Sequence, residues 1–191
     1  MQGGRQGTGS MGISRRAALI GGAALAGVAA GPAPATAWSF EFPSIDEGTL
    51  RLAEFQGKVL LVVNTASFCG FTPQYRQLEV LHRRLSPQGF AVIGVPSQDF
   101  GQESGSNGEV KAFCEATFGV DFPMAGLGHV RGADASPFYR WVREQRRWEP
   151  QWNFNKVLIG RDGGIAGTFG STDEPDRGRL AAAIQAAMAR T

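Results

Sequence analysis

The sequence predicts a three-layer α/β domain, in which helices cover both faces of a central mixed β-sheet. Two apolar runs of strand length, residues 58–66 and 90–96, are each followed by a helical pattern, and this order is typical of a parallel β-α-β unit. Residues 155–169 show the pattern of a hairpin, which adds an antiparallel edge, and a last helical pattern closes the chain.

The first half of the domain starts with residues 40–58, FEFPSIDEGTLRLAEFQGK, which predict an extended piece, a turn at Asp46 to Gly48 and a brief return. The next run, KVLLVVNTA, is continuously apolar and β-branched, as expected for a strand that is covered on both faces. A helix should follow, because Thr72 can cap it and Pro73 suits its first turn. Its inner face carries three leucines: Leu78, Leu81 and Leu85.

The second half begins with FAVIGVP, a second buried strand. Ser106 with Glu109 three residues later forms a capping box, and Gly119 marks the end of the helix that it starts. The hairpin turns at Asp162 and Gly163, and the last helix runs from about residue 176, with an apolar face of Leu180, Ile184 and Met188. This order of elements is that of the thioredoxin-like fold, whose first strand-to-helix junction is the place for chemistry.

The N-terminus predicts a targeting segment. Ser14, Arg15 and Arg16 precede the uncharged run AALIGGAALAGVAA, and GPAPATA then ends in the small-x-small pattern of a signal-peptidase site. We therefore expect residues 1–37 to be a twin-arginine-type signal that is removed after Ala37, so that the domain of residues 38–191 is periplasmic or otherwise exported, without a stable membrane association. An uncleaved membrane anchor is the alternative, and Met11 is an alternative start.

Composition excludes several function classes. The chain of 191 residues is 42% hydrophobic with a formal charge of +2, which becomes −1 without Arg5 and the arginine pair of the signal. A near-neutral domain has no electrostatic footprint for nucleic acid or an anionic membrane. With only His82 and His129, it has few ligands for zinc and little material for a Ser-His-Asp triad, so we expect neither a metal nor a cofactor.

One residue stands out as a candidate nucleophile. Cys69, in NTASFCGFTPQY, lies between the first buried strand and the helix, where unpaired N–H groups and the helix dipole favour a thiolate. Gly70 beside it leaves the sulfur accessible. Position alone does not exclude a small buried structural residue, because cysteine is often buried.

Four blocks of the sequence resemble the glutathione peroxidase family, in the right order over nearly all of the domain. They are GKVLLVVNTASFCGFTPQY, VPSQDFGQESGS, FCEATFGVDFPM and WNFNKVLIGRDG. The resemblance implies a thioredoxin-like peroxidase whose catalytic tetrad falls on Cys69, Gln102, Trp152 and Asn153. The thiolate would attack one peroxide oxygen, while the neutral amide and indole donors stabilise the departing anion.

The second cysteine, Cys114, lies within the predicted helix of residues 106–119. The resemblance places it at the resolving position of thioredoxin-dependent members, where it would condense with a sulfenic acid on Cys69. A core residue or a permanent structural disulfide with Cys69 are the alternatives. Because a disulfide needs Cα atoms within about 7 Å, we expect residues 104–119 to be mobile.

The sequence departs from the family pattern in several places. The stretch FGQES is one residue shorter than the usual FGGQEP, which puts the reach of Gln102 in question, and Ser97 stands where many relatives carry a cysteine. Cysteine takes the place of the selenocysteine of some vertebrate members. A reaction at cysteine relies more on activation of the thiol. The short link from FPM to WNF favours a monomer over the tetrameric members.

These observations lead to one hypothesis and two alternatives. The hypothesis is a peroxidase for hydrogen peroxide and organic hydroperoxides, with Cys69 as nucleophile, Cys114 as resolving thiol and a thioredoxin-like dithiol protein as reductant. Glutathione is the weaker reductant, because no basic cluster for its carboxylates is evident. The alternatives are a redox sensor or relay that oxidises a partner, and a non-enzymatic module with a stable disulfide.

Overall fold

The computed structural model describes residues 35–190, which are built around a four-stranded sheet in the order β4-β3-β5-β6. The strands are β3 (Val59–Thr65), β4 (Phe90–Pro96), β5 (Lys156–Ile159) and β6 (Ile165–Phe169). Strand β3 pairs parallel with β4 and antiparallel with β5, and β5 pairs antiparallel with β6. The predicted mixed sheet, with its parallel pair and its hairpin edge, is confirmed.

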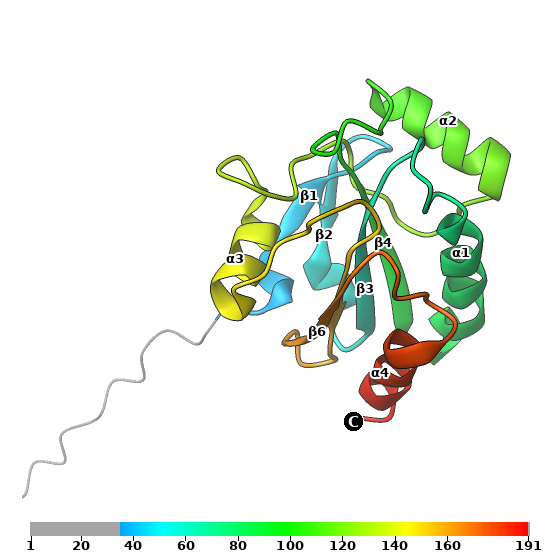
Figure 1. Ribbon diagram of the computed structural model, residues 1–191. Coiled ribbons are helices and arrows are strands. Elements are labelled where there is room, and N and C mark those ends of the chain that lie inside the picture. Colours follow the sequence, from blue (N-terminus) through cyan, green and yellow to red (C-terminus); the bar gives the residue numbers. More distant parts are fainter. Residues whose placement is uncertain (1–34, 191) are drawn as a thin grey trace, which may run out of the picture. The chain divides into compact units, whose positions relative to one another are not determined.

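Helices cover both faces of this sheet, as Figure 1 shows, with α3 on one side and α1 and α4 on the other. One face packs against α1 (Gln74–Leu85) and α4 (Gly178–Met188), and the other against α3 (Pro137–Arg146). A two-stranded sheet of β1 (Glu41–Pro43) and β2 (Thr49–Arg51) adds to the α3 side. The three-layer α/β/α architecture is therefore confirmed.

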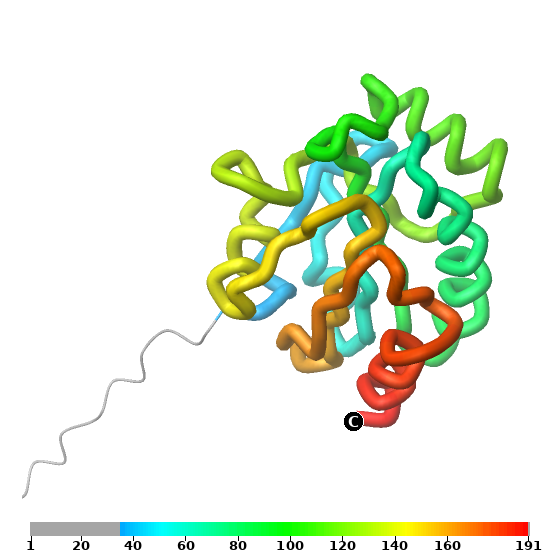
Figure 2. The backbone as a smooth tube through the Cα atoms, in the orientation of Figure 1, coloured from blue at the N-terminus to red at the C-terminus, as the bar shows by residue number. Residues whose placement is uncertain are grey.

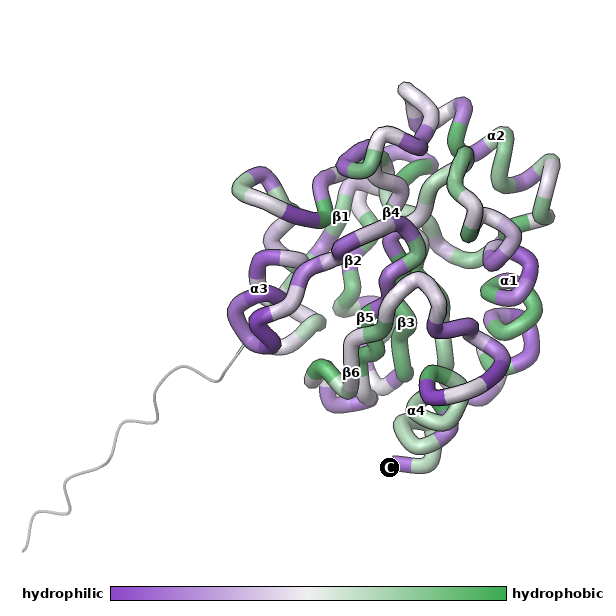
Figure 3. The backbone as a smooth tube through the Cα atoms, in the orientation of Figure 1, coloured by the Kyte–Doolittle hydropathy of each residue, from purple (hydrophilic) through white to green (hydrophobic). Residues whose placement is uncertain are grey.

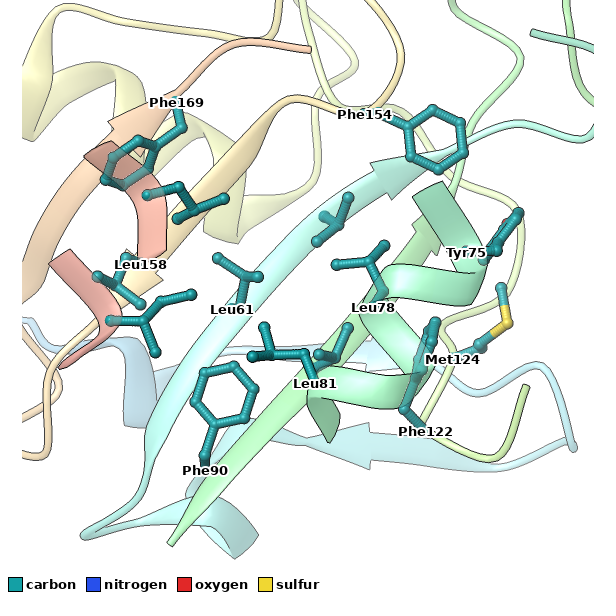
Figure 4. Close-up of a cluster of buried hydrophobic side chains, with 14 of the residues drawn as sticks. Leu61, Tyr75, Leu78, Leu81, Phe90, Phe122, Met124, Phe154, Leu158 and Phe169 are labelled. Carbon is teal, nitrogen blue, oxygen red and sulfur yellow. The ribbon is translucent and has the colours of Figure 1, made fainter. Parts of the chain in front are cut away.

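Burial on both faces explains the continuous apolar runs. Every residue of β3 and β4 is buried, and alternate side chains of β3 enter different cores. Strands β3 and β5 accordingly appear in the green of hydrophobic residues at the centre of Figure 3. Figure 4 shows the core on the α1 side, where Leu61 and Leu158 of the sheet meet Leu78 and Leu81 of the helix.

The local signals at turns and helix ends also hold. The first turn has two left-handed residues, Glu47 and Gly48, and the hairpin turn has Gly163 at φ +79°. Helix α2 (Asn107–Phe118) starts after Ser106, whose Oγ accepts a 3.3 Å hydrogen bond from the backbone N–H of Glu109, and it ends at Gly119. Short 3-10 helices connect the elements: η1 (Ala37–Ser39), η2 (Leu52–Phe55) and η3 (Ser86–Gln88).

Helix α3 is the one long element that the sequence analysis did not predict. It starts at Pro137, a residue that suits a first turn, and its buried face consists of Phe138, Tyr139, Trp141 and Val142. These residues fill the hydrophobic core between α3 and the sheet. Their spacing along one helix face is the sequence signal that predicts this helix. None of the helices within residues 35–190 has the length and apolar character that a membrane span requires.

Candidate active site

Cys69 lies on a tight turn between β3 and α1. Its backbone carbonyl accepts a hydrogen bond from Thr72 N, three residues later. Further hydrogen bonds with the same i+3 to i spacing continue into the first residues of α1. The Phe71 N–H points at the sulfur, with 3.4 Å between N and Sγ. The predicted position between the first buried strand and the first helix is confirmed, since β3 ends at Thr65 and α1 begins at Gln74, and one backbone donor is directed at Sγ.

The predicted role of Thr72 as the cap of α1 is wrong. Its Oγ1 accepts from Cys69 N at 3.0 Å and donates to Ala66 O at 2.9 Å, so it closes the cysteine turn. Pro73 takes the capping position, and no side chain caps the helix there. These two hydrogen bonds join Thr72 to Cys69 and to Ala66, the residue after β3, and thereby fix the backbone that carries the sulfur.

Gln102 and Asn153 come together at this turn. The Asn153 Nδ2 donates to Gln102 Oε1 at 2.9 Å, and the Gln102 backbone carbonyl accepts from Phe68 N at 3.0 Å, beside Cys69. Figure 2 shows that the segments of Cys69, Gln102 and Asn153 converge at one end of the sheet. The shorter loop therefore still brings the backbone of Gln102 to the residue before Cys69, and its side chain to Asn153.

Trp152 belongs to the same segment as Asn153 but is more open to solvent. Its side chain is 42% exposed, and its ring lies 5.5 Å from that of Phe100, between centroids. Phe68, next to Cys69, is 65% exposed. Phe68 thus gives the cysteine turn an exposed aromatic side chain, Trp152 packs against Phe100, and Asn153 is fully buried.

Asn64 holds the segment of Trp152 and Asn153 in place, and the sequence analysis did not find it. Its buried side chain donates to Trp152 O and accepts from Asn155 N, both at 3.0 Å, and its backbone carbonyl accepts from Phe154 N at 2.6 Å. Phe154 has φ +57°, a left-handed conformation that is strained for a bulky residue. An amide inside an otherwise apolar strand was the available signal.

Asp99 anchors the loop of Gln102 in a similar way. Its Oδ2 accepts from the backbone N–H groups of Val130 (2.7 Å) and Arg131 (3.2 Å), and its Oδ1 lies 2.7 Å from Nδ1 of His129. These hydrogen bonds lower the pKa of Asp99 against the opposing effect of its partial burial. The loop between β4 and α2 is therefore fixed on both sides of Phe100.

Cys114 is buried in α2, and both cysteines are free thiols in the structure. Burial is the main cause that raises the pKa of Cys114 to about 11, so its resting form is the neutral thiol. Tyr75 of α1 lies beside it. The rings of Phe68 and Phe113, the immediate neighbours of the two cysteines, lie 6.1 Å apart, which brings the two cysteine segments side by side.

Lys156 is fully buried below this site. Its Nζ donates to Gln74 Oε1 (2.6 Å) and to the backbone carbonyl of Asp173 (2.9 Å), with two further carbonyls at 3.4 Å. Burial lowers the pKa of Lys156 to about 7. The ammonium connects the start of α1 to the loop after β6. Across residues 35–190, no three His, Cys, Asp or Glu side chains gather in a way that could hold a metal ion.

Comparison with known proteins decides the family. The model of the glutathione peroxidase family matches residues 37–143, a range that includes Cys69, Gln102 and Cys114. The chain belongs to the glutathione peroxidase family. It is an oxidoreductase that reduces peroxides with thiols.

Individual relatives agree over most of their length. The chain is 40% identical to the hydroperoxy fatty acid reductase gpx1 of Synechocystis over 152 residues, which are 74% of this chain and 90% of the relative. It is 38% identical to the glutathione peroxidase-like peroxiredoxin gpx1 of Schizosaccharomyces pombe, over 69% of this chain and 86% of that one.

Solved structures confirm the fold. The crystal structure of Trgpx in its apo form superimposes with a TM-score of 0.64 at 33% identity, and covers 81% of this chain and 96% of its own. A putative thiol:disulfide interchange protein, DsbE from Chlorobium tepidum, is similar in fold alone, with a TM-score of 0.57 at 21% identity over 78% of this chain and 92% of that one. The predicted thioredoxin-like fold is thus confirmed.

Proposed function

We propose that this glutathione peroxidase works as a two-cysteine enzyme. The Cys69 thiolate attacks one peroxide oxygen and becomes a sulfenic acid, and the other oxygen leaves as hydroxide or alkoxide. Cys114 then condenses with the sulfenic acid to form a disulfide and water, and a thioredoxin-like dithiol protein reduces the disulfide. The observation that carries the proposal is the meeting of Gln102 and Asn153 at the Cys69 turn.

The bond between the two amides assigns them different tasks. Asn153 Nδ2 is engaged with Gln102 Oε1, which fixes the Gln102 amide with its Nε2 N–H groups as the donors that remain for the peroxide. Preorganised donors of this kind typically contribute about a hundredfold or more in rate. Trp152 adds an indole N–H at the more exposed side of the site, and its tilted contact with Phe100, at an interplanar angle of 53°, orients the ring.

Resolution requires Cys114 to leave the core. Val110 and Cys114 of α2 are buried, and Phe113 and Phe118 are partly buried against the same core, so these four side chains hold the helix while its remaining residues have little apolar contact to lose. The contact between Phe68 and Phe113 guides the approach, because it joins the residues next to each sulfur. We therefore propose that α2 opens locally after Cys69 is oxidised.

A protein dithiol suits this site better than glutathione. A groove of about 560 Å³ starts at Gly70 and Phe71, and two arginines line it, Arg76 and Arg177. Arg177 forms an ion pair with Glu174, and the guanidinium of Arg76 lies 5.3 Å from the ring centroid of Phe118. Arg177 is thus already paired with a carboxylate, and Arg76 by itself does not form the cluster of cations that the two carboxylates of glutathione would need. The relatives named as peroxiredoxins point the same way.

The substrate class includes organic hydroperoxides as well as hydrogen peroxide. Phe68 directly precedes Cys69 and Trp152 directly precedes Asn153, and their exposed aromatic side chains offer an apolar surface for an organic hydroperoxide. The name of the Synechocystis relative, a hydroperoxy fatty acid reductase, supports the same class.

Export and a monomeric state complete the proposal. The predicted signal lies almost entirely outside the described residues. Within them, Ala37 is fully buried, and its N–H donates to Gly163 O at 2.9 Å. The predicted cleavage after Ala37 would remove this hydrogen bond, whereas cleavage before Ala37 would keep it. N-terminal sequencing of the protein from a periplasmic extract tests the signal and its cleavage site, and sedimentation analysis tests the monomer.

Peroxide titration of the reduced protein tests the cycle. One equivalent of hydroperoxide should rapidly consume both thiols of the parent. Cys69→Ser should be inert, and Cys114→Ser should stop at the sulfenic acid. Ala116→Ser, on an exposed position of the same helix, is the matched control and should behave like the parent. Oxidation at the rate of an ordinary free thiol would refute the peroxidase, and fast oxidation that ends in mixed disulfides with a partner would favour the redox relay.

A further inference from the structure

A row of three phenylalanine rings leads away from Cys69. Phe68, which directly precedes the cysteine, lies 6.1 Å from Phe113, and Phe113 lies 5.7 Å from Phe118, between ring centroids. Phe68 is 65% exposed, and the two rings of α2 are half-buried. We call these three residues the aromatic row. Apolar side chains that remain open to solvent next to a nucleophile indicate a binding surface for an apolar molecule.

A guanidinium lies at the far end of the aromatic row. The central carbon of the Arg76 guanidinium is 5.3 Å from the ring centroid of Phe118, over the ring, which is a cation–π contact. In this position the N–H groups at the edge of the guanidinium stay available, and two of them match the two oxygens of a carboxylate. The row therefore joins an apolar surface to a cation.

The carboxylates closest to Arg76 along the chain and in the groove already have partners. Glu79 of α1 pairs with Arg83. Glu174, which lines the same groove as Arg76, pairs with Arg177. Within residues 35–190, Arg76 forms no ion pair of its own. An unpaired cation at the end of an apolar row is complementary to an anion that carries an apolar chain.

The groove also joins Arg76 to the cysteine turn. Its volume is about 560 Å³, and Gly70 and Phe71 line it together with Arg76. The backbone N–H of Phe71 is the group that points at the sulfur of Cys69, at 3.4 Å. One elongated molecule can therefore contact the cysteine turn and the guanidinium at the same time.

We propose that Arg76 determines the substrate specificity of the enzyme by pairing with the carboxylate of a long-chain hydroperoxy acid. The apolar chain of this substrate lies on the aromatic row, and its peroxide group reaches Cys69. The assignment rests on the peroxidase activity proposed above and selects one class among the organic hydroperoxides. A single cation suffices, because such an acid carries a single carboxylate. Hydrogen peroxide has neither the charge nor the chain and gains nothing from this surface.

The test compares two peroxides that differ only in charge, the hydroperoxide of linoleic acid and that of methyl linoleate, both below their critical micelle concentrations. Stopped-flow mixing with the reduced protein gives the rate constant of sulfenate formation on Cys69. The parent should prefer the acid about fivefold, the upper range for an exposed ion pair. Raising the ionic strength from about 0.05 to 0.5 M should reduce this preference. In Arg76→Met the ratio of acid to ester should fall to about one, and Arg76→Lys should keep part of it.

The aromatic row is tested with the same two peroxides. Phe113→Ala should lower the rate constants of the acid and the ester severalfold relative to that of hydrogen peroxide on the same variant, because both long-chain molecules use the row. An unchanged ratio to hydrogen peroxide would show that the chain does not lie there.

Controls separate this assignment from the peroxidase itself. Arg84→Met, at an exposed position of the same helix, is the matched control and should keep the ratio of the parent. Equal rates with acid and ester in the parent, or a preference that survives in Arg76→Met, overturn the role of Arg76. Should Arg76→Met not fold, the salt dependence of the parent's preference decides in its place. A parent that reacts with all three peroxides no faster than an ordinary free thiol refutes the proposed function.

Discussion

The buried Lys156 predicts an unusual dependence of stability on pH. Its pKa falls from 10.5 to about 7 in the folded protein, a difference that corresponds to about 5 kcal/mol at 1.36 kcal/mol per pKa unit. Between these pKa values the unfolded chain binds one proton more than the native protein, so the free energy of unfolding rises with pH. The contribution is complete above pH 10.5 and is lost as the pH falls through about 7.

The rise in the free energy of unfolding that Lys156 causes is best measured between pH 7.0 and 8.5. At higher pH, ionisation of the buried Cys114 and Tyr75 lowers the free energy of unfolding and opposes this rise. Between pH 7.0 and 8.5, the Lys156 contribution should grow by roughly 1.5 kcal/mol. Urea unfolding of the reduced protein, followed by circular dichroism at both pH values, measures this change.

Lys156→Met removes the titrating group and should abolish the increase. Lys58→Met, at an exposed position, is the matched control and should keep it. If the parent and Lys156→Met changed their free energy of unfolding equally between the two pH values, the argument from the buried ammonium would be wrong.

Three further predictions concern the loops of the site and the unpredicted helix. Gln102→Ala and Asn153→Ala should each slow sulfenate formation about a hundredfold. In stopped-flow measurements the double variant should lose less than the product of both effects, since a 2.9 Å bond couples the amides; strictly multiplicative losses would show that they act independently. Phe138→Ala should lower the free energy of unfolding by about 3–5 kcal/mol in urea titrations, because the ring is fully buried under α3; a loss below about 1 kcal/mol would contradict this packing. Asp99→Ala should slow sulfenate formation while thiol content stays unchanged, because the loop of Gln102 loses its anchor, and an unaltered rate would show that the anchor is dispensable.

Local patterns in the sequence determined the strands of the main sheet and the helices α1, α2 and α4, with most of their ends, but not α3. Continuous apolar runs predict strands buried on both faces, and Ser106, Gly119 and the turn at Asp162 and Gly163 mark boundaries through hydrogen bonds and backbone preferences within a few residues. These interactions depend on neighbours in the chain. The same locality places Cys69 at a strand-to-helix junction.

Only the tertiary structure decided which side chains support the site. Asn64 reaches Trp152 and Asn155 across 88 and 91 positions, and Glu103 reaches Ser67 across 36. No local pattern reports such partners, because they meet only after β3, β5 and the loops between them have packed. Thr72 shows the same limit at short range: its position suits a helix cap, but its hydroxyl bonds Cys69 N and Ala66 O in the cysteine turn and does not cap α1.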